Sequence, residues 1–331
     1  MFEYLRNDKF DSRSPFDGKT LPPFRLNQFG ASLGGRLIKD RTFFFVTYEG
    51  LRQRRGQTLI GFVPSQEFRT RALLTSPALK PILDAYLPGD TPTNDPNVMQ
   101  RTALGSHLQD ENAGTFRVDH RISDKTTAYF RGNVMEADLA APLGGSDGFL
   151  DLTSTTHSGI LNGVLSAQHV FSPTMLNEIK FGANRLPSSN RRFNRLGFRV
   201  TIPGFTPIAE ADIDSAETPT RFTLQDNFTM TRGRHTWKAG FEIRPTRFAN
   251  RRRGDGNNIA YANINDFLNN RLNSAQVSAE QYMNGVRKNV FGAFLQDEWK
   301  VQRDLTLNLG GSLRLLRRAE RRLQTAVPVR S

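Results

Sequence analysis

The sequence of 331 residues contains no cysteine, which excludes a disulfide framework, a thiolate metal site and a cysteine nucleophile. It also has no long hydrophobic run: no stretch approaches the roughly 18 consecutive apolar residues that a membrane-spanning helix needs. Hydrophobic residues make up 37% of the chain, which is low for a globular enzyme of this length. These absences favour a fold that does not depend on one large buried core.

Charge is the first positive feature. The formal net charge is +13, and arginine supplies most of it. Such a balance is typical of proteins with an anionic partner, either a nucleic acid or a charged membrane surface. The arginines concentrate at 52–55, 191–195, 251–253 and 317–322, with no shared spacing, and we expect them to be scattered through loops.

Motifs for catalysis or metal binding are missing from the sequence. The five histidines have no HExxH-type spacing, and there is no GxSxG or phosphate-binding GxxxxGK[ST] pattern. His120 and His169 fall near strand ends with the parity of the apolar residues, which favours an interfacial position over metal ligation. Asp297 and Glu298 are consecutive in a strand and point to opposite faces, so they cannot act as an acid/base couple. We therefore predict no enzyme activity, no cofactor and no metal site.

Period-2 alternation of apolar and polar residues dominates the chain and predicts an all-β fold. The clearest case is TFRVDHRISDKTTAYFRGNV at 115–134, two alternating runs joined at Ser-Asp-Lys. About eleven strands are expected, several of them near ten residues long, which suits a tilted membrane strand. They are expected at 2–7, 28–34, 42–52, 115–122, 126–134, 160–171, 175–185, 221–231, 235–247, 291–299 and 305–309.

One helical stretch interrupts this pattern, at 65–87. Its start resembles a helix cap at Ser65, and Pro77 and Pro81 are expected to break it.

The connections between the expected strands alternate strictly between short and long. Short turns are expected at 38–41, 123–125, 172–174, 232–234 and 301–304, and long connections at 8–27, 53–112, 138–159, 186–220 and 248–289. In a soluble sandwich, connections this long would argue against the strand assignment. In an outer-membrane barrel they are the rule, because the periplasmic turns are short and the outer loops are long.

This interpretation assigns a solvent to each face of the sheet. A bilayer cannot hydrogen-bond backbone groups, so a sheet crosses it only as a closed barrel whose apolar face meets lipid. In the 115–134 hairpin, Phe116, Val118, Phe130 and Val134 are expected to face lipid. The residues predicted to face the lumen are Arg117, Asp119, Arg131, Glu178, Lys180, Lys238, Glu242 and Arg244.

Trp237 and Trp299 lie beside the short turns at 232–234 and 301–304. They are expected at the periplasmic rim, where outer-membrane barrels carry an aromatic girdle. The alternative is that the two tryptophans belong to a soluble core.

Two blocks of sequence are similar to a known family. The segment NQFGASLGGRLIKDRTFFFVTYEGLRQR at 27–54 resembles the start of the barrel in Oar-like TonB-dependent transporters, where a Gly-Gly strand end, a Lys-Asp turn and an aromatic strand with Tyr-Glu-Gly follow one another. FEYLRN at 2–7 and NVFGAFLQDEWKVQRDLTLNLG at 289–310 also match. The resemblance reaches to about Gly310 and is looser in the middle of the chain.

The resemblance implies a twenty-two-stranded outer-membrane barrel, plugged by an N-terminal globular domain and energised by TonB, that imports a ligand or exports a substrate. A signal sequence, a plug, a TonB-contacting segment and the terminal aromatic strand are not found in the sequence, so we expect about the first half of a barrel. The expected domains are a partial barrel at 1–315 and a basic, non-barrel tail at 316–331 that is helix or coil.

The function predicted on this basis is ligand uptake or substrate passage across the outer membrane, with lipid as the partner of the apolar face. TonB would be a partner only if a longer protein supplies the plug, and the ligand is not readable. Two alternatives stay open: a soluble basic β protein that binds nucleic acid, and a passive pore that closes without a plug.

Overall fold

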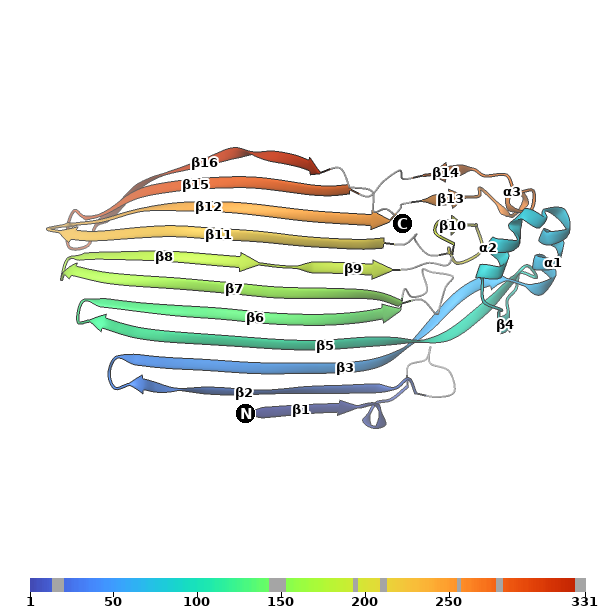
Figure 1. Ribbon diagram of the computed structural model, residues 1–331, viewed down its shortest axis with the longest axis horizontal. Coiled ribbons are helices and arrows are strands. Elements are labelled where there is room, and N and C mark those ends of the chain that lie inside the picture. Colours follow the sequence, from blue (N-terminus) through green and yellow to red (C-terminus); the bar gives the residue numbers. More distant parts are fainter. Residues whose placement is uncertain are drawn as a thin grey trace.

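The computed structural model describes residues 1–13, 21–142, 153–192, 196–208, 213–254, 257–277 and 282–324. Most of these residues belong to one antiparallel sheet, and a small group of helices and short strands lies at one end of it (Figure 1). No helix in the described ranges is long and apolar enough to cross a membrane.

Eleven strands form the main path of the sheet, and each is hydrogen-bonded to the next. In order they are β1 (Phe2–Asn7), β2 (Phe24–Ile38), β3 (Thr42–Pro64), β5 (Val98–Ser123), β6 (Thr126–Pro142), β7 (Thr153–Ser172), β8 (Met175–Arg185), β11 (Ile213–Arg232), β12 (His235–Gly254), β15 (Tyr282–Lys300) and β16 (Thr306–Gln324). The predicted all-β fold of about eleven strands is confirmed.

Two further strands lie beside this path. β9 (Ser188–Arg192) continues the line of β8 and pairs with the same neighbours, β7 and β11. The two strands are separated at Leu186 and Pro187, and a proline has no amide hydrogen for the ladder. β4 (Thr91–Pro92) pairs with β5 only.

All five short turns lie at one end of the sheet and the long connections lie at the other (Figure 1). The short turns comprise residues 39–41, 124–125, 173–174, 233–234 and 301–305. Their tightness requires left-handed backbone at two places, Asp40 with φ 57° and Gly233 with φ 62°. The predicted alternation of short and long connections is therefore confirmed.

The predicted bounds of the long connections are wrong, because the strands run further than the alternation of side chains suggests. β5 has 26 residues and β3 has 23, so the connection expected at 53–112 is reduced to 65–97. β12 and β15 likewise extend into the connection expected at 248–289. The expected loops at 138–159 and 186–220 fall partly outside the described residues. A membrane crossing needs about 9–11 strand residues. Backbone pairing in β3 and β5 continues beyond that length, through residues whose side chains no longer alternate between apolar and polar.

The predicted non-barrel tail at 316–331 is also wrong as far as residue 324. β16 continues to Gln324 and pairs with β15 as far as Met283, so residues 316–324 are strand rather than tail. The period-2 signal was present, since Leu307, Leu309, Leu313 and Leu315 all have odd numbers. The dense run of arginine after Leu316 masked it. Residues 325–331 of the expected tail lie outside the described part of the chain.

The long connections build a separate unit at the end of the sheet opposite the short turns (Figure 1). We call this end of the strands the outer end, and the unit the outer knob. Its elements are α1 (Gln66–Thr75), η2 (Pro77–Leu79), α2 (Lys80–Ala85), β10 (Arg199–Thr201), β13 (Asn258–Ala260), α3 (Ile264–Leu268) and β14 (Ser274–Gln276); the remaining short helix, η1 (Asp8–Phe10), follows β1. β10, β13 and β14 form a three-stranded sheet. Ser65 caps α1 as predicted, accepting a hydrogen bond from the Phe68 amide. Pro77 separates the helices, but Pro81 is accommodated in the first turn of α2 and does not break it.

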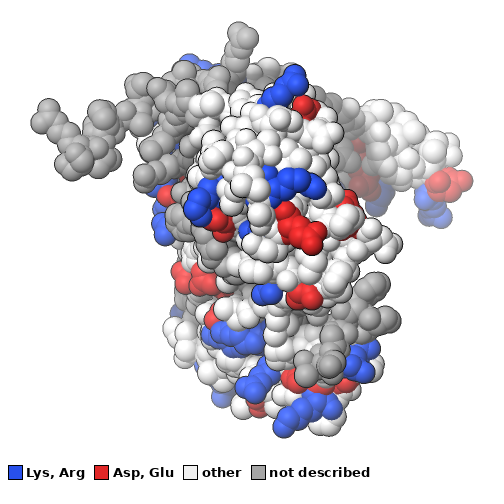
Figure 2. Space-filling view, turned by 90° about the vertical axis from the view of Figure 1, so that its right-hand side faces the viewer, with Lys and Arg blue, Asp and Glu red and all other residues white. Residues whose placement is uncertain are grey.

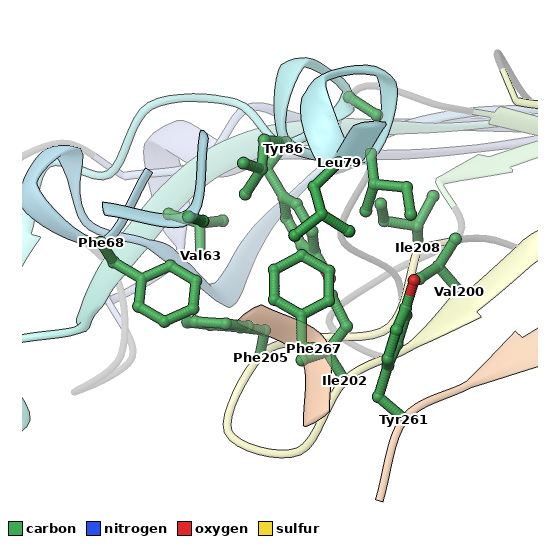
Figure 3. Packing of buried hydrophobic residues seen from close by; sticks show 14 of the residues in the cluster. Val63, Phe68, Leu79, Tyr86, Val200, Ile202, Phe205, Ile208, Tyr261 and Phe267 are labelled. Atoms are coloured by element: carbon green, nitrogen blue, oxygen red, sulfur yellow. The ribbon is translucent and has the colours of Figure 1, made fainter. Parts of the chain in front are cut away.

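The outer knob has the buried core that the large sheet lacks (Figure 3). The ring of Phe267 packs between those of Phe68 and Tyr261, with its centroid 6.1 Å from the first and 4.9 Å from the second. Thr206, in the connection before β11, contacts the end of β3 and the connection that follows it. Its amide donates to the Phe62 carbonyl at 2.8 Å, and its own carbonyl accepts from the Tyr86 hydroxyl at 2.9 Å. Three connections that are distant in sequence thus form one packed unit.

Candidate functional site

The sheet register defines two faces along the whole molecule, because directly opposed residues of antiparallel strands point to the same side. One row of opposed residues crosses ten strands and is apolar throughout. This apolar row is Gly35, Phe44, Val118, Phe130, Leu165, Phe181, Leu224, Ile243, Phe291 and Leu315. We call the side of the sheet that carries it the apolar face.

A second row, displaced by one residue in each strand, is rich in charge. This polar row is Arg36, Phe43, Asp119, Tyr129, Ser166, Lys180, Gln225, Glu242, Gly292 and Arg314. It marks the polar face. A face-to-face difference that persists over ten strands means that the two sides of the sheet are built for different surroundings.

The apolar face is left open by the described residues. Leu165 has 50% of its surface exposed, Phe181 48% and Leu315 56%. Soluble monomers rarely expose contiguous apolar patches larger than a few hundred Å². A sheet face of this extent needs an apolar environment.

The height of the apolar face matches a bilayer. On β12 the apolar positions run from Trp237 through Phe241 to Pro245, which is eight residue steps. At about 3.3 Å per step they span roughly 26 Å along the strand, close to the apolar band of about 25 Å in outer-membrane barrels. The next residue on this face is Arg247.

Trp237 and Trp299 both lie on the apolar face, near the short-turn end. His235 stacks between them, with ring centroids 5.3 Å and 5.4 Å away and ring planes tilted by 8° and 14°. The Nδ1 atom of His235 lies 2.7 Å from a carboxylate oxygen of Asp297. Sequence reasoning placed the tryptophans at this end but missed the stack, whose signal was the His-x-Trp spacing at 235–237.

Two other histidines occupy equivalent positions on their own strands. His120 and His169 sit on the apolar face beside short turns, where their Nδ1 atoms lie 2.9 Å from Thr42 Oγ1 and 2.8 Å from Thr126 Oγ1. Among the described residues, no group of three or more metal-ligating side chains comes together. The arrangement suits hydrogen-bonding rings at a membrane boundary.

The register puts all eight predicted lumen residues on the polar face. Six of them form ion pairs between residues two apart in one strand. Arg117 and Asp119 are 2.7 Å apart, Glu178 and Lys180 are 2.8 Å apart, and Glu242 contacts Arg244. Such neighbours share a face, so the pairs keep charge density high and local net charge low.

Arg131 and Lys238 complete the predicted set. Arg131 lies directly opposite Arg117 in the register. Lys238 is exposed on β12, opposite Thr229. Arg117 is also held over the ring of Tyr129, 4.3 Å from its centroid. The resulting surface is charged, with basic and acidic groups side by side.

The arginine clusters, expected to be scattered through loops, prove to lie at the outer ends of strands. Arg52 and Arg54 are on β3, Arg191 is on β9 and Arg251 is on β12. This end of the molecule, viewed directly, presents basic and acidic side chains interspersed over its surface (Figure 2).

The chain matches the family model described as "Outer membrane beta barrel domain" over residues 1–86 and 70–314. No curated protein matches it. Among solved structures it is similar to the outer membrane transporter YddB from Escherichia coli, with 10% identity and a TM-score of 0.50 over 90% of this chain and 35% of YddB.

Two further structures are matched with lower scores. The ferric-catecholate import receptor Fiu from E. coli K12 has 12% identity and a TM-score of 0.35 over 88% of this chain and 52% of Fiu. The siderophore receptor PiuA from Acinetobacter baumannii has 9% identity and a TM-score of 0.31 over 89% of this chain and 60% of PiuA. The chain thus spans about a third to three fifths of the structures that it matches.

The family match covers almost all of the described sheet, and the YddB likeness is a likeness of fold. These two matches and the two-faced sheet confirm the β-barrel interpretation and an outer-membrane location. The chain belongs to the outer membrane β-barrel domain family.

Proposed function

We propose that this chain forms part of the wall of a TonB-dependent outer-membrane transporter, with the apolar face against lipid and the polar face lining the interior. The observation that carries the proposal is the pair of rows, one apolar and one charged, that cross ten strands in register. Lipid accepts the first row and a water-filled interior accepts the second. Passage of a polar solute requires such an interior.

The edges of the sheet support a larger barrel. The main path runs from β1 to β16, and no pairing joins these two strands within the described ranges. β1 has 6 residues and β16 has 19, so closure of one upon the other would leave most of β16 unpaired. Unpaired backbone is not tolerated in a bilayer. We infer that further strands complete the wall.

Transport that depends on TonB is the finer part of the proposal. It rests on the similarity of residues 27–54 and 289–310 to Oar-like transporters, and YddB, a transporter, shares the fold. In such a protein a plug supplied by the longer chain would contact TonB, and the wall described here would supply the polar passage. No reaction is required of the wall.

A passive pore is the second candidate, since a charged interior would also suit free diffusion. The isolated chain, reconstituted in planar bilayers, separates the two. The wall proposal predicts no stable unitary conductance from these strands alone, because the sheet is incomplete. A steady, uniform conductance would instead mean that the chain closes by itself and acts as a pore.

Energy coupling is tested with the longer protein in cells. Solute accumulation should stop when an uncoupler dissipates the proton-motive force of the inner membrane, whereas passive diffusion would continue. Binding of the solute to intact cells should persist in both cases, which controls for loss of the protein.

A further inference from the structure

The apolar face carries a row of arginines immediately beyond its membrane-height band, at the end away from the short turns. The first charged residues there are arginines on four strands, namely Arg52 on β3, Arg185 on β8, Arg247 on β12 and Arg287 on β15. On β5 and β6 they are Asp110 and Glu136, and Asp110 lies opposite Arg52. All four arginines occupy the same side of the sheet as the apolar row. Arg185, Arg247 and Arg287 lie on one register line, through Thr220 of β11, and this repeated position points to an anionic layer just outside the hydrocarbon.

Two of these arginines are placed directly against each other. Arg247 and Arg287 are opposed in the register of β12 and β15, and both side chains are exposed. Like charges directly opposite each other destabilise a sheet. Neither arginine makes an ion pair with another described residue, so an anion between them would relieve the repulsion.

A groove lies beside this pair. Its volume is about 320 Å³, and small residues of the apolar face line it, namely Ala216, Thr218, Ala249 and Gly285. Arg251 and Arg287 border the groove, and Met283 contributes an apolar wall. The small residues provide space and the arginines provide donors in the same place.

The charge balance of the site is positive. Asp214 accepts from Arg251 at 3.1 Å and lies 3.7 Å from Arg191. Among the side chains that the structure describes here, Asp214 is thus the carboxylate that pairs with two of the four arginines at 191, 247, 251 and 287.

Below the groove, the same strands continue into the apolar band. Ile243 lies four residues from Arg247 on β12, and Phe291 lies four residues from Arg287 on β15. A molecule with a phosphate at the groove and an acyl chain along these residues would satisfy both parts of the surface. Free phosphate would use only the first part.

We propose that Arg247, Arg251 and Arg287 form a binding site on the outer wall for the phosphate-bearing headgroup of an outer-leaflet glycolipid. Guanidinium groups bind phosphate through paired charge-assisted hydrogen bonds, which makes arginine the fitting residue. This inference rests on the proposed orientation of the apolar face toward lipid.

The test uses the full chain in phosphatidylcholine vesicles with and without a minor fraction of a bisphosphorylated glucosamine lipid. Native mass spectrometry, after extraction into neutral detergent, counts the glycolipid molecules that stay bound. The double variant Arg247→Gln/Arg287→Gln should retain at least about fivefold less glycolipid than the parent chain, because two charge-assisted contacts are lost.

The matched control is Arg252→Gln/Lys288→Gln, which removes the same charge from the same two strands on the opposite face. It should retain glycolipid like the parent. Equal losses in both variants, or no loss in the first, would overturn the site. Displacement of the glycolipid by inorganic phosphate at equal concentration would show a site for soluble anions and would overturn the lipid assignment.

A separate readout distinguishes failure of the site from failure of the proposed orientation. The chain has no cysteine, so the variant Phe291→Cys can carry a single fluorophore. Nitroxide-labelled phospholipid should quench that fluorophore if the apolar face meets lipid. Quenching with unchanged glycolipid retention in the Arg247→Gln/Arg287→Gln variant would reject the site alone. Absence of quenching would reject the orientation and the site together.

Discussion

Arg117 and Asp119 are two residues apart on β5 and form an ion pair, with Nη2 2.7 Å from Oδ1. Both side chains are about two-fifths exposed, at 40% and 42%. The pair holds opposite charges side by side on the polar face, next to Arg131, which lies directly opposite Arg117. It therefore sets the local charge of the proposed passage more than it stabilises the fold.

Asp119→Asn should leave the barrel fold intact while making the passage more anion-selective. Exposed ion pairs contribute about 0–1 kcal/mol, so the free energy of unfolding should change by less than about 1 kcal/mol. The reversal potential of the longer barrel in a salt gradient measures selectivity. Arg117→Gln removes the opposite charge and should shift selectivity toward cations. A shift in the same direction for both variants would contradict the position of this ion pair on the wall of the passage.

Gly240 is a position in the sheet where a Cβ would meet both a ring and the backbone of a neighbouring strand. A Cβ there would lie 2.5 Å from the ring of Phe294 and 2.7 Å from the carbonyl oxygen of Asp226. Gly240→Ala should cost about 1–3 kcal/mol, because the backbone cannot yield as a flexible side chain would. Urea unfolding followed by circular dichroism measures the loss.

The matched control for that change is Gly311→Ala, since nothing lies within 4 Å of a Cβ at Gly311. It should be close to neutral. Equal losses at the two positions would mean that the register around Gly240 differs from the one described.

The outer knob should loosen without loss of the sheet when its core is opened. Phe267 is fully buried against Phe68 and Tyr261, and Phe267→Ala should destabilise the knob by about 3–5 kcal/mol. Limited proteolysis should then cut within residues 65–97, while the strand signal in circular dichroism stays constant. Phe10→Ala is the control, because Phe10 is 90% exposed. Loss of the strand signal would show that the sheet depends on the knob.

Tyr261 makes the stability of the knob sensitive to alkaline pH. Burial raises the pKa of its phenol above the ordinary value of 10.0. The folded-state pKa of this phenol lies above the unfolded-state pKa. The stability that the buried phenol gives the knob is therefore complete below about pH 10 and is lost as the pH rises through the folded-state pKa. Protease resistance of the knob should fall in that range and fall less in Tyr261→Phe. An identical alkaline profile for the two proteins would contradict this role.

Arg69 shows how far the knob depends on buried polar contacts. Its guanidinium donates to the carbonyls of Pro64, Leu83, Tyr86 and Leu87, all in the α1–α2 region. Burial lowers the pKa of Arg69, yet the side chain stays charged because the ordinary pKa of a guanidinium lies far above neutral pH. One side chain thus satisfies several helix-end carbonyls.

The strands were predictable because their side chains alternate, and the outer knob was not. The alternation of Phe116, Val118, Phe130 and Val134 reports a lipid-facing surface residue by residue. It could not report where β3 or β5 ends, because the outer parts of these strands do not alternate. Residues 53–58 are mostly polar, and the apolar residues that follow, such as Val63, enter the core of the knob. The core around Phe267 joins three distant connections, and no local pattern encodes such contacts.

The polar face was predictable from parity, whereas the arginine site was not. Parity alone selects Lys180, Glu242 and Arg244. The opposition of Arg247 and Arg287 depends on the register between β12 and β15, across a connection of more than twenty residues. Arg247 and Arg287 belong to none of the arginine clusters visible in the sequence, and they become neighbours only through that register.

Lys180 and Phe181 provide the most direct test of the central claim, because they are adjacent in β8 but belong to the polar and the apolar row. The chain has no cysteine, so Lys180→Cys and Phe181→Cys can each carry one fluorophore at the same membrane depth. In reconstituted vesicles, nitroxide phospholipid should quench the label at 181, and aqueous iodide should quench the label at 180. Equal quenching of both labels by either agent, or the reverse assignment, would contradict the two-faced wall.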